Sequence, residues 1–119
     1  MSLWRRLTGA SGEHTEDSVE TIKDNLANGR AVMLDVRSQE ERDAGYLKDS
    51  VFIPITEIKA LPENTTDLPQ LDKSQIVYCH WKAGVRAQMA AKILGSMDYD
   101  VRTLKESFEE LVELGLESH

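Results

Sequence analysis

One short stretch in the second half of the chain combines residue types that could bind and activate a small anion. Cys79 and His80 end an apolar run, and Gly84 and Arg86 follow shortly afterwards. A loop that closes into a helix turns several backbone N–H groups inward, and glycine permits close approach to them. An arginine adds a forked cation that suits an oxyanion. A cysteine at the base of such a loop would be a thiolate nucleophile, and the same dipoles would hold a persulfide.

A simpler interpretation of Cys79 competes with this one. A free cysteine near the end of an apolar strand is commonly a small buried hydrophobic residue, and residue type alone favours that role. Of the three histidines, only His80 is adjacent to Cys79 in the sequence. The chain has no spacing of Cys and His residues that is typical of a zinc site. We therefore expect no metal site.

A second candidate turn follows the first apolar run. Asp35 and Arg37 lie two residues apart at the end of this run, and Glu41 follows four residues after Arg37. Residues two apart in a strand share one side of it. Because buried charges need partners, we interpret all three as structural support, with Arg37 paired to Glu41. The functional alternative is that Arg37 faces a bound anion.

The surrounding pattern is that of a parallel α/β domain. Apolar runs of strand length alternate with stretches of helical periodicity, which predicts βα units and helices on both faces of a sheet. In such a sheet ligands bind at the carboxyl ends of the strands, where both candidate turns lie. We expect a flexible arm over residues 1–15 and one domain over 16–119. Predicted strands cover residues 31–36, 51–53, 75–79 and 101–104, and predicted helices cover 18–28, 38–44, 55–61, 85–95 and about 108–115.

The composition disfavours several classes of protein. The chain has 119 residues, of which 40% are hydrophobic and 29% are charged, as in one soluble globular domain. Its net charge of −7 disfavours nucleic acid and anionic membrane as partners. No apolar run approaches the roughly 18 residues of a membrane-spanning helix. A single cysteine is compatible with a reducing compartment, and we expect a cytoplasmic protein.

From about residue 17 to its end, the chain resembles the single-domain rhodaneses, a family of sulfurtransferases. The order and spacing of several short motifs carry the resemblance together. These motifs are Asp35-Val36-Arg37, Glu41, Gly45-Tyr46-Leu47, Ile53-Pro54, Ala83-Gly84-Val85-Arg86-Ala87, Tyr99-Asp100-Val101 and Leu104. Tyr46 stands where the family usually has histidine, and Glu106-Ser107 replaces its usual Gly-Gly pair. The resemblance implies a three-layer α/β fold with a central, mostly parallel sheet of five strands.

The resemblance also implies an activity. A cysteine thiolate takes sulfane sulfur from thiosulfate or a related donor and passes it, through a persulfide, to a thiol or cyanide. The family needs no metal or organic cofactor for this, and a protein sulfur acceptor is a further candidate partner. On this interpretation Cys79 is the catalytic residue. The residues that would bind the donor are His80, Trp81, Lys82, Ala83, Gly84, Val85 and Arg86.

The active-site loop departs from the family pattern, which is Cys-x-x-Gly-x-Arg. Counting back from Gly84 and Arg86 places Trp81 at the nucleophile position, whereas Cys79 comes two residues earlier. In one interpretation the loop is two residues longer and Cys79 is the nucleophile, which the catalytic character of the family favours. In the other, the strand continues through His80, Cys79 lies within it, and the domain binds without catalysing. A phosphatase or arsenate reductase with an unusual loop is a third hypothesis.

Overall fold

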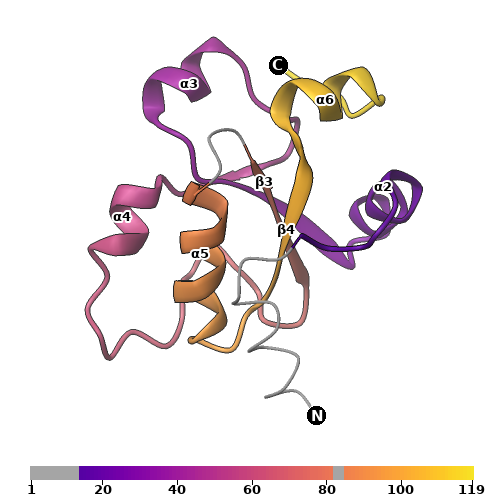
Figure 1. Cartoon of the computed structure of the whole chain (residues 1–119). Coiled ribbons are helices and arrows are strands. Elements are labelled where there is room, and N and C mark those ends of the chain that lie inside the picture. Colours follow the sequence, from indigo (N-terminus) through magenta and orange to yellow (C-terminus); the bar gives the residue numbers. More distant parts are fainter. Residues whose placement is uncertain (1–13, 82–84) are drawn as a thin grey trace.

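Four parallel strands form one sheet in this computed structural model, which describes residues 14–81 and 85–119. The strands are β1 (Ala31–Asp35), β2 (Val51–Phe52), β3 (Ile76–Trp81) and β4 (Asp100–Ser107), arranged in the order β2-β1-β3-β4 (Figure 1). All three neighbouring pairs are parallel. The carboxyl ends of the strands therefore lie at one edge, where a ligand site is expected.

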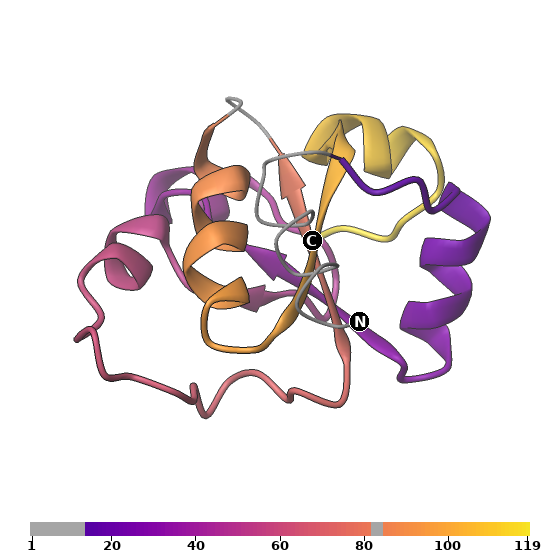
Figure 2. The same ribbon diagram turned by 60° about the horizontal axis from the view of Figure 1, so that its bottom comes forward.

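Helices cover both faces of this sheet. Helices α4 (Ile55–Lys59) and α5 (Val85–Gly95) lie on one side, and α2 (Val19–Ala27) and α6 (Phe108–Glu113) lie on the other (Figure 2). Helix α3 (Gln39–Ala44) lies with α6 near the carboxyl end of the sheet in Figure 1. The predicted three-layer α/β fold is confirmed.

Local sequence signals start three of the helices. The hydroxyls of Ser18, Ser38 and Ser107 each accept a hydrogen bond from the backbone N–H three residues later. In α3 and α6 a glutamate at that third position also accepts the serine N–H, which completes a capping box. Each cap satisfies N–H groups that have no partner inside the helix, so these short helices can begin where they do.

The sheet separates two hydrophobic cores. One packs α4 and α5 against residues such as Leu34, Val77 and Cys79, and the other packs α2 and α6 against residues such as Met33 and Tyr78. Successive residues of β1 and β3 thus enter opposite cores. This explains why both strands are apolar on both sides.

The structure corrects the sequence-based elements in several places; strand β4, for example, was expected to end at Leu104 and continues to Ser107. The described residues form four named strands rather than five, because beyond β4 only His14 pairs with the sheet, through a single bridge to Thr103. The N–H of Thr15 also donates to the Thr103 carbonyl at 2.8 Å. Strand β3, expected to end at Cys79, continues to Trp81. The predicted arm lies outside the described residues except for His14 and Thr15.

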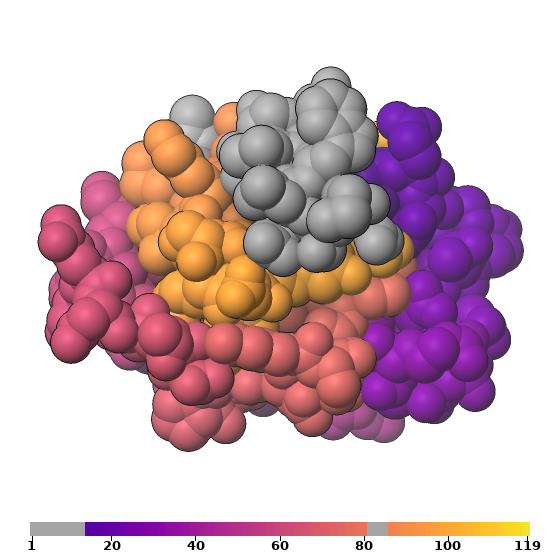
Figure 3. Space-filling view, turned by 90° about the horizontal axis from the view of Figure 1, so that it is seen from below, coloured from indigo at the N-terminus to yellow at the C-terminus, as the bar shows by residue number. Residues whose placement is uncertain are grey.

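The long connection between α4 and β3, residues 60–75, runs over the surface on the flank opposite α2 (Figure 3). The Tyr99 hydroxyl anchors it by accepting the N–H of Leu68 at 2.8 Å. Among the helices of the described residues, none has the length and apolar character needed to cross a membrane.

Candidate functional site

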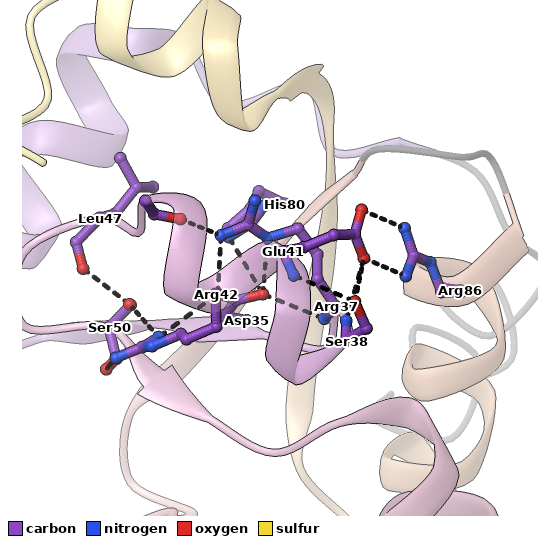
Figure 4. A network of polar contacts seen from close by, with 10 residues as sticks. Asp35, Arg37, Ser38, Glu41, Arg42, Leu47, Ser50, His80 and Arg86 are labelled. Atoms are coloured by element: carbon purple, nitrogen blue, oxygen red, sulfur yellow. Dashed lines mark hydrogen bonds and ion pairs between the residues drawn. The ribbon is translucent and has the colours of Figure 1, made fainter. Parts of the chain in front are cut away.

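A buried acid at the end of β1 organises the carboxyl edge of the sheet. Asp35 is fully buried and accepts three hydrogen bonds from Arg37: from the backbone N–H at 3.0 Å, Nε at 2.9 Å and Nη2 at 3.1 Å (Figure 4). Arg42 adds a fourth at 3.3 Å. Burial alone would raise the pKa of this carboxyl group, but the hydrogen bonds from Arg37 outweigh it and hold the pKa below its usual value.

Arg37 supports the edge rather than facing solvent. Its Nη2 donates to the Gly45 carbonyl at 2.7 Å, and its guanidinium lies 4.5 Å from the ring centroid of Phe108 at the start of α6. The expected pairing of Arg37 with Glu41 is wrong, because Asp35, two residues before it on the same strand end, holds the guanidinium instead. The geometry of Arg37 thus agrees with its interpretation as structural support.

Glu41 pairs instead with Arg86, the first cation of α5. The two side chains form a forked ion pair, with distances of 2.6 Å from Nη1 to Oε1 and 3.0 Å from Nη2 to Oε2 (Figure 4). The hydrogen bonds from Arg86 lower the pKa of Glu41 to about 2. This pair, here called the α3–α5 latch, joins the beginnings of two helices. It also means that the arginine expected to bind an oxyanion already holds a carboxylate.

His80 lies in the interior beside these charges. Its side chain is fully buried, and neither ring nitrogen has a hydrogen-bond partner among the described residues. Its Nε2 lies 3.8 Å from Oδ1 of Asp35, and its ring lies 6.1 Å from that of Phe108. Burial lowers the pKa of His80 to about 4, although the Asp35 carboxylate opposes this. At neutral pH, His80 is therefore an uncharged base.

Cys79 lies inside the core that packs against α5. Its side chain has no exposed surface and belongs to the same cluster as Leu34, Ala87 and Ala90. Burial raises the pKa of the thiol well above its usual value, and the Asp35 carboxylate raises it further. The thiol is therefore protonated at neutral pH in this conformation.

The structure places only some of the predicted site residues. His80, Arg86, Asp35, Arg37 and Glu41 come together at the carboxyl edge. Trp81 is the last residue of β3 and Val85 is the first of α5. The remaining predicted donor-binding residues, Lys82, Ala83 and Gly84, lie outside the described residues.

Two residues of this edge were not expected from the sequence. Arg42 reaches from α3 to Asp35 and to the Ser50 hydroxyl at 2.8 Å, and its guanidinium lies 3.9 Å from the Tyr46 ring centroid. Phe108 lies between Arg37 and His80. Helical spacing placed Phe108 in a helix, but only the packing of α6 over the edge reveals its contacts with both residues.

The described part of the chain contains no cluster of three or more His, Cys, Asp or Glu side chains arranged to hold a metal ion. The charged groups of the described edge are largely paired with one another, Arg37 with Asp35 and Arg86 with Glu41, and His80 is a buried neutral base beside them.

Comparison with known proteins agrees with this geometry. Residues 18–114 match the family model of the rhodanese-like domain. The human thiosulfate:glutathione sulfurtransferase is 30% identical over 89 residues, which cover 66% of this chain and 77% of that protein.

Solved structures show the same fold. The yeast single domain sulfurtransferase RDL2 matches with a TM-score of 0.64 and 18% identity, over 85% of this chain and 94% of that one. The human single domain sulfurtransferase TSTD1 matches with a TM-score of 0.60 and 23% identity, over 82% of this chain and 94% of that one. The BH2092 protein of Bacillus halodurans matches with a TM-score of 0.69 and 18% identity, over 98% of this chain and 83% of that one. From the parallel sheet, the motifs at its carboxyl edge and the family match over residues 18–114, we conclude that the chain belongs to the rhodanese-like family of sulfurtransferases.

Proposed function

We propose that this rhodanese-like domain binds a small sulfur oxyanion, such as thiosulfate, at the carboxyl edge of its sheet without transferring sulfur through Cys79. The observation that carries the proposal is the position of Cys79, which is fully buried in the α5 core while β3 continues to Trp81. Sulfur transfer needs an accessible thiolate in contact with its donor. Burial and the Asp35 carboxylate both favour the protonated thiol instead.

The register of the strand adds a second argument. Residues 79 and 81 are about 6.6 Å apart along a strand. Small misplacements of a reacting group already reduce rates strongly. With Trp81 directly before the loop, Cys79 lies one strand repeat short of the position where a family nucleophile would stand. This arrangement supports the interpretation in which Trp81 occupies the nucleophile position.

Sulfur transfer by Cys79 is the second candidate function, and one observation favours it. The human thiosulfate:glutathione sulfurtransferase is 30% identical over 66% of this chain, and Cys79 is the one cysteine available. In this mechanism the Cys79 thiolate attacks the outer sulfur of thiosulfate, an S–S bond forms, and sulfite leaves with the electron pair. A thiol or cyanide acceptor then removes the sulfur and restores the thiolate. Residues 80–86 would bind the donor, and the end of β3 would have to open.

For both candidate functions we propose a cytoplasmic location. A reduced thiol, and thiol acceptors of low molecular mass or on proteins, suit a reducing compartment.

Four variants of the chain separate the two candidates: the native protein, Cys79→Ser, Trp81→Cys and the double variant. Turnover of thiosulfate and cyanide is measured for each, with circular dichroism to confirm folding and Cys79→Ala in reserve if serine unfolds the core. The binding proposal expects an inactive native protein and activity that appears in Trp81→Cys and persists in the double variant. The sulfurtransferase candidate expects native activity that Cys79→Ser abolishes.

Other outcomes contradict both candidates. Inactivity of all four folded proteins, together with hydrolysis of an aryl phosphate or reduction of arsenate by the native chain, would favour the phosphatase or reductase hypothesis. For the binding proposal, thiosulfate should shift the backbone amide resonances of residues 80–88 in the native protein. If those resonances do not move at millimolar thiosulfate, the proposed anion site is wrong.

A further inference from the structure

Among the described residues, no strand lies beside the first half of β1 on the β2 side. Strand β2 contains only two residues, which pair with Leu34 and Asp35. The Arg30 carbonyl accepts from Ile76 on the β3 side, whereas the Asp35 carbonyl accepts from Ile53 on the β2 side. Since backbone groups of successive strand residues point to alternate sides, both backbone groups of Ala31 and the N–H of Met33 face the side where β2 has not begun.

The registers of β1 with β2 and β3 leave these three backbone groups without a ladder partner among the described residues, and the turn and loop hydrogen bonds do not include them. Ala31 and Met33 are nevertheless only 5% and 3% exposed. Backbone N–H and C=O groups in such surroundings are almost always paired, and an unpaired sheet edge is a template for another strand. The groups therefore need a partner that the described residues do not provide, and water or a ligand can supply it.

A pocket of about 330 Å³ lies along this edge. Helix α2 forms one wall, the segment after α6 forms another, and the turn before β2 closes one end. Its apolar lining includes Leu26, Ala31, Met33, Leu47 and Leu116. The volume lies within the range of about 300–1,000 Å³ that is usual for ligand pockets. The pocket borders the amino-terminal half of β1, whereas the candidate anion site lies at the carboxyl ends of the strands.

One cation at the rim of the pocket has no acidic partner. Lys48 lies 3.7 Å from Glu117, but Lys23 forms no ion pair with a described residue. The Lys23 ammonium lies over Gly115, 2.7 Å from the position that a Cβ on that glycine would take. Asp49, on the turn before β2, is the other lining charge without a described partner. A ligand that carries a carboxylate opposite Lys23 would complement this rim.

We propose that the pocket binds an extended peptide, which adds as a short strand to the free edge of β1 and pairs an acidic side chain with Lys23. The alternation of free N–H and C=O groups at Ala31 and Met33 matches the backbone of an extended chain. The apolar lining accepts an aliphatic side chain next to the acidic one. The sheet edge of a second copy fits less well, because both edges would be recessed between α2 and the segment after α6.

Two measurements test this proposal on the whole protein. In the free protein, amide hydrogen exchange should be markedly faster at Ala31 and Met33 than at Val32 and Leu34, whose amides face β3. A blocked pentapeptide of valine and threonine with a central glutamate should then shift the resonances of Ala31 and Met33 and slow their exchange. The same peptide with a central lysine should bind about threefold more weakly, which is the scale of an exposed ion pair.

Charge reversal provides the matched control. Lys23→Glu should invert the preference between the two peptides, whereas Lys92→Glu, an exposed lysine of α5, should leave it unchanged. Equal protection of all four amides would show that the edge is closed and overturn the proposal. So would an absence of shifts at millimolar peptide, or a peptide preference that Lys23→Glu does not alter. Dimerisation through this edge, detected by sedimentation, would replace the peptide by a second copy.

Discussion

His80 is a buried base next to a buried acid, with no hydrogen bond between them. Its neighbours provide charges of both signs: Asp35 opposes the lowering of its pKa, as does Glu109, while Arg37 and Arg42 favour it. Burial dominates these effects and lowers the pKa to about 4. The folded state therefore favours the uncharged form of the His80 ring.

This leads to a pH dependence of stability. In the unfolded chain His80 binds a proton near pH 6.5, whereas the folded protein binds it only near pH 4. The free energy of unfolding should therefore fall as the pH is lowered through this window, by about 3 kcal/mol in total, and the His80 contribution should level off below it. Urea unfolding at several pH values measures this.

Two variants check the assignment to His80. His80→Phe should flatten the dependence between pH 6.5 and 4, since the phenyl ring carries no proton. His119→Gln, at the exposed end of the chain, should leave it in place. A native-like pH slope in His80→Phe would contradict the assignment.

Cys79 provides a second test at the residue scale. Because its thiol is fully buried and its pKa is raised, a thiol reagent should modify it only when the protein opens. The modification rate of the native protein at pH 8 should rise with urea in parallel with unfolding. Rapid modification of native Cys79 would contradict its burial and favour the sulfurtransferase candidate.

At the scale of elements, the α3–α5 latch connects two helices that the sheet alone does not join. Glu41 serves two purposes, since it closes the capping box of α3 through Ser38 and binds Arg86 at the start of α5. The ion pair neutralises Arg86, one of the residues proposed to bind the anion. The latch therefore couples the position of α5 to whether the Arg86 guanidinium is free to bind an oxyanion.

Replacing Glu41 by glutamine separates these two roles, because glutamine still closes a capping box. We expect Glu41→Gln to lower the free energy of unfolding by less than about 1 kcal/mol, as for partly exposed ion pairs. It should also release Arg86 and tighten thiosulfate binding several-fold in the resonance titration. Glu40→Gln, next to it on α3, is the control and should change neither quantity.

The latch has its own pH signature. The pKa of Glu41 is lowered to about 2, so its contribution to stability is present above pH 4.5 and disappears as the pH falls towards 2. This loss occurs at lower pH than that of His80. In a double-mutant cycle of Glu41→Gln and Arg86→Gln, an absent coupling energy would contradict the latch.

At the scale of the molecule, two cores share one sheet. Leu94 of α5 is fully buried on one face, and Leu104 of β4 is fully buried in the other core. Leu94→Ala and Leu104→Ala should each lower the free energy of unfolding by about 2–5 kcal/mol. Each variant should still unfold in one transition, because the strands belong to both cores. Separate near- and far-ultraviolet dichroism transitions in either variant would show that the cores unfold independently.

The order of helices and strands could be predicted from the sequence because its signals are local. Serine caps, apolar runs and glycines such as Gly29 act within a few residues, and the family motifs repeat that local order. The four apolar runs predicted the four strands, whereas the fifth strand implied by the resemblance does not occur among the described residues. Beyond β4 they contribute only the bridge of His14 to Thr103, which is a contact between distant parts of the chain.

Residue types and their spacing were enough to predict the fold class, the family and the two interpretations of the loop around Cys79 and Trp81. The partners of the charges had to be read from the packed fold. Glu41 and Arg86 are 45 residues apart and meet because α3 and α5 both begin at the carboxyl edge, a distance that residue spacing does not reveal. With Glu41 held by Arg86, Arg37 pairs with its near neighbour Asp35. The length of β3 depends in the same way on a distant segment, since the pairing with β1 ends at Cys79 and only β4 pairs with the strand beyond it, through Trp81 and Ser107.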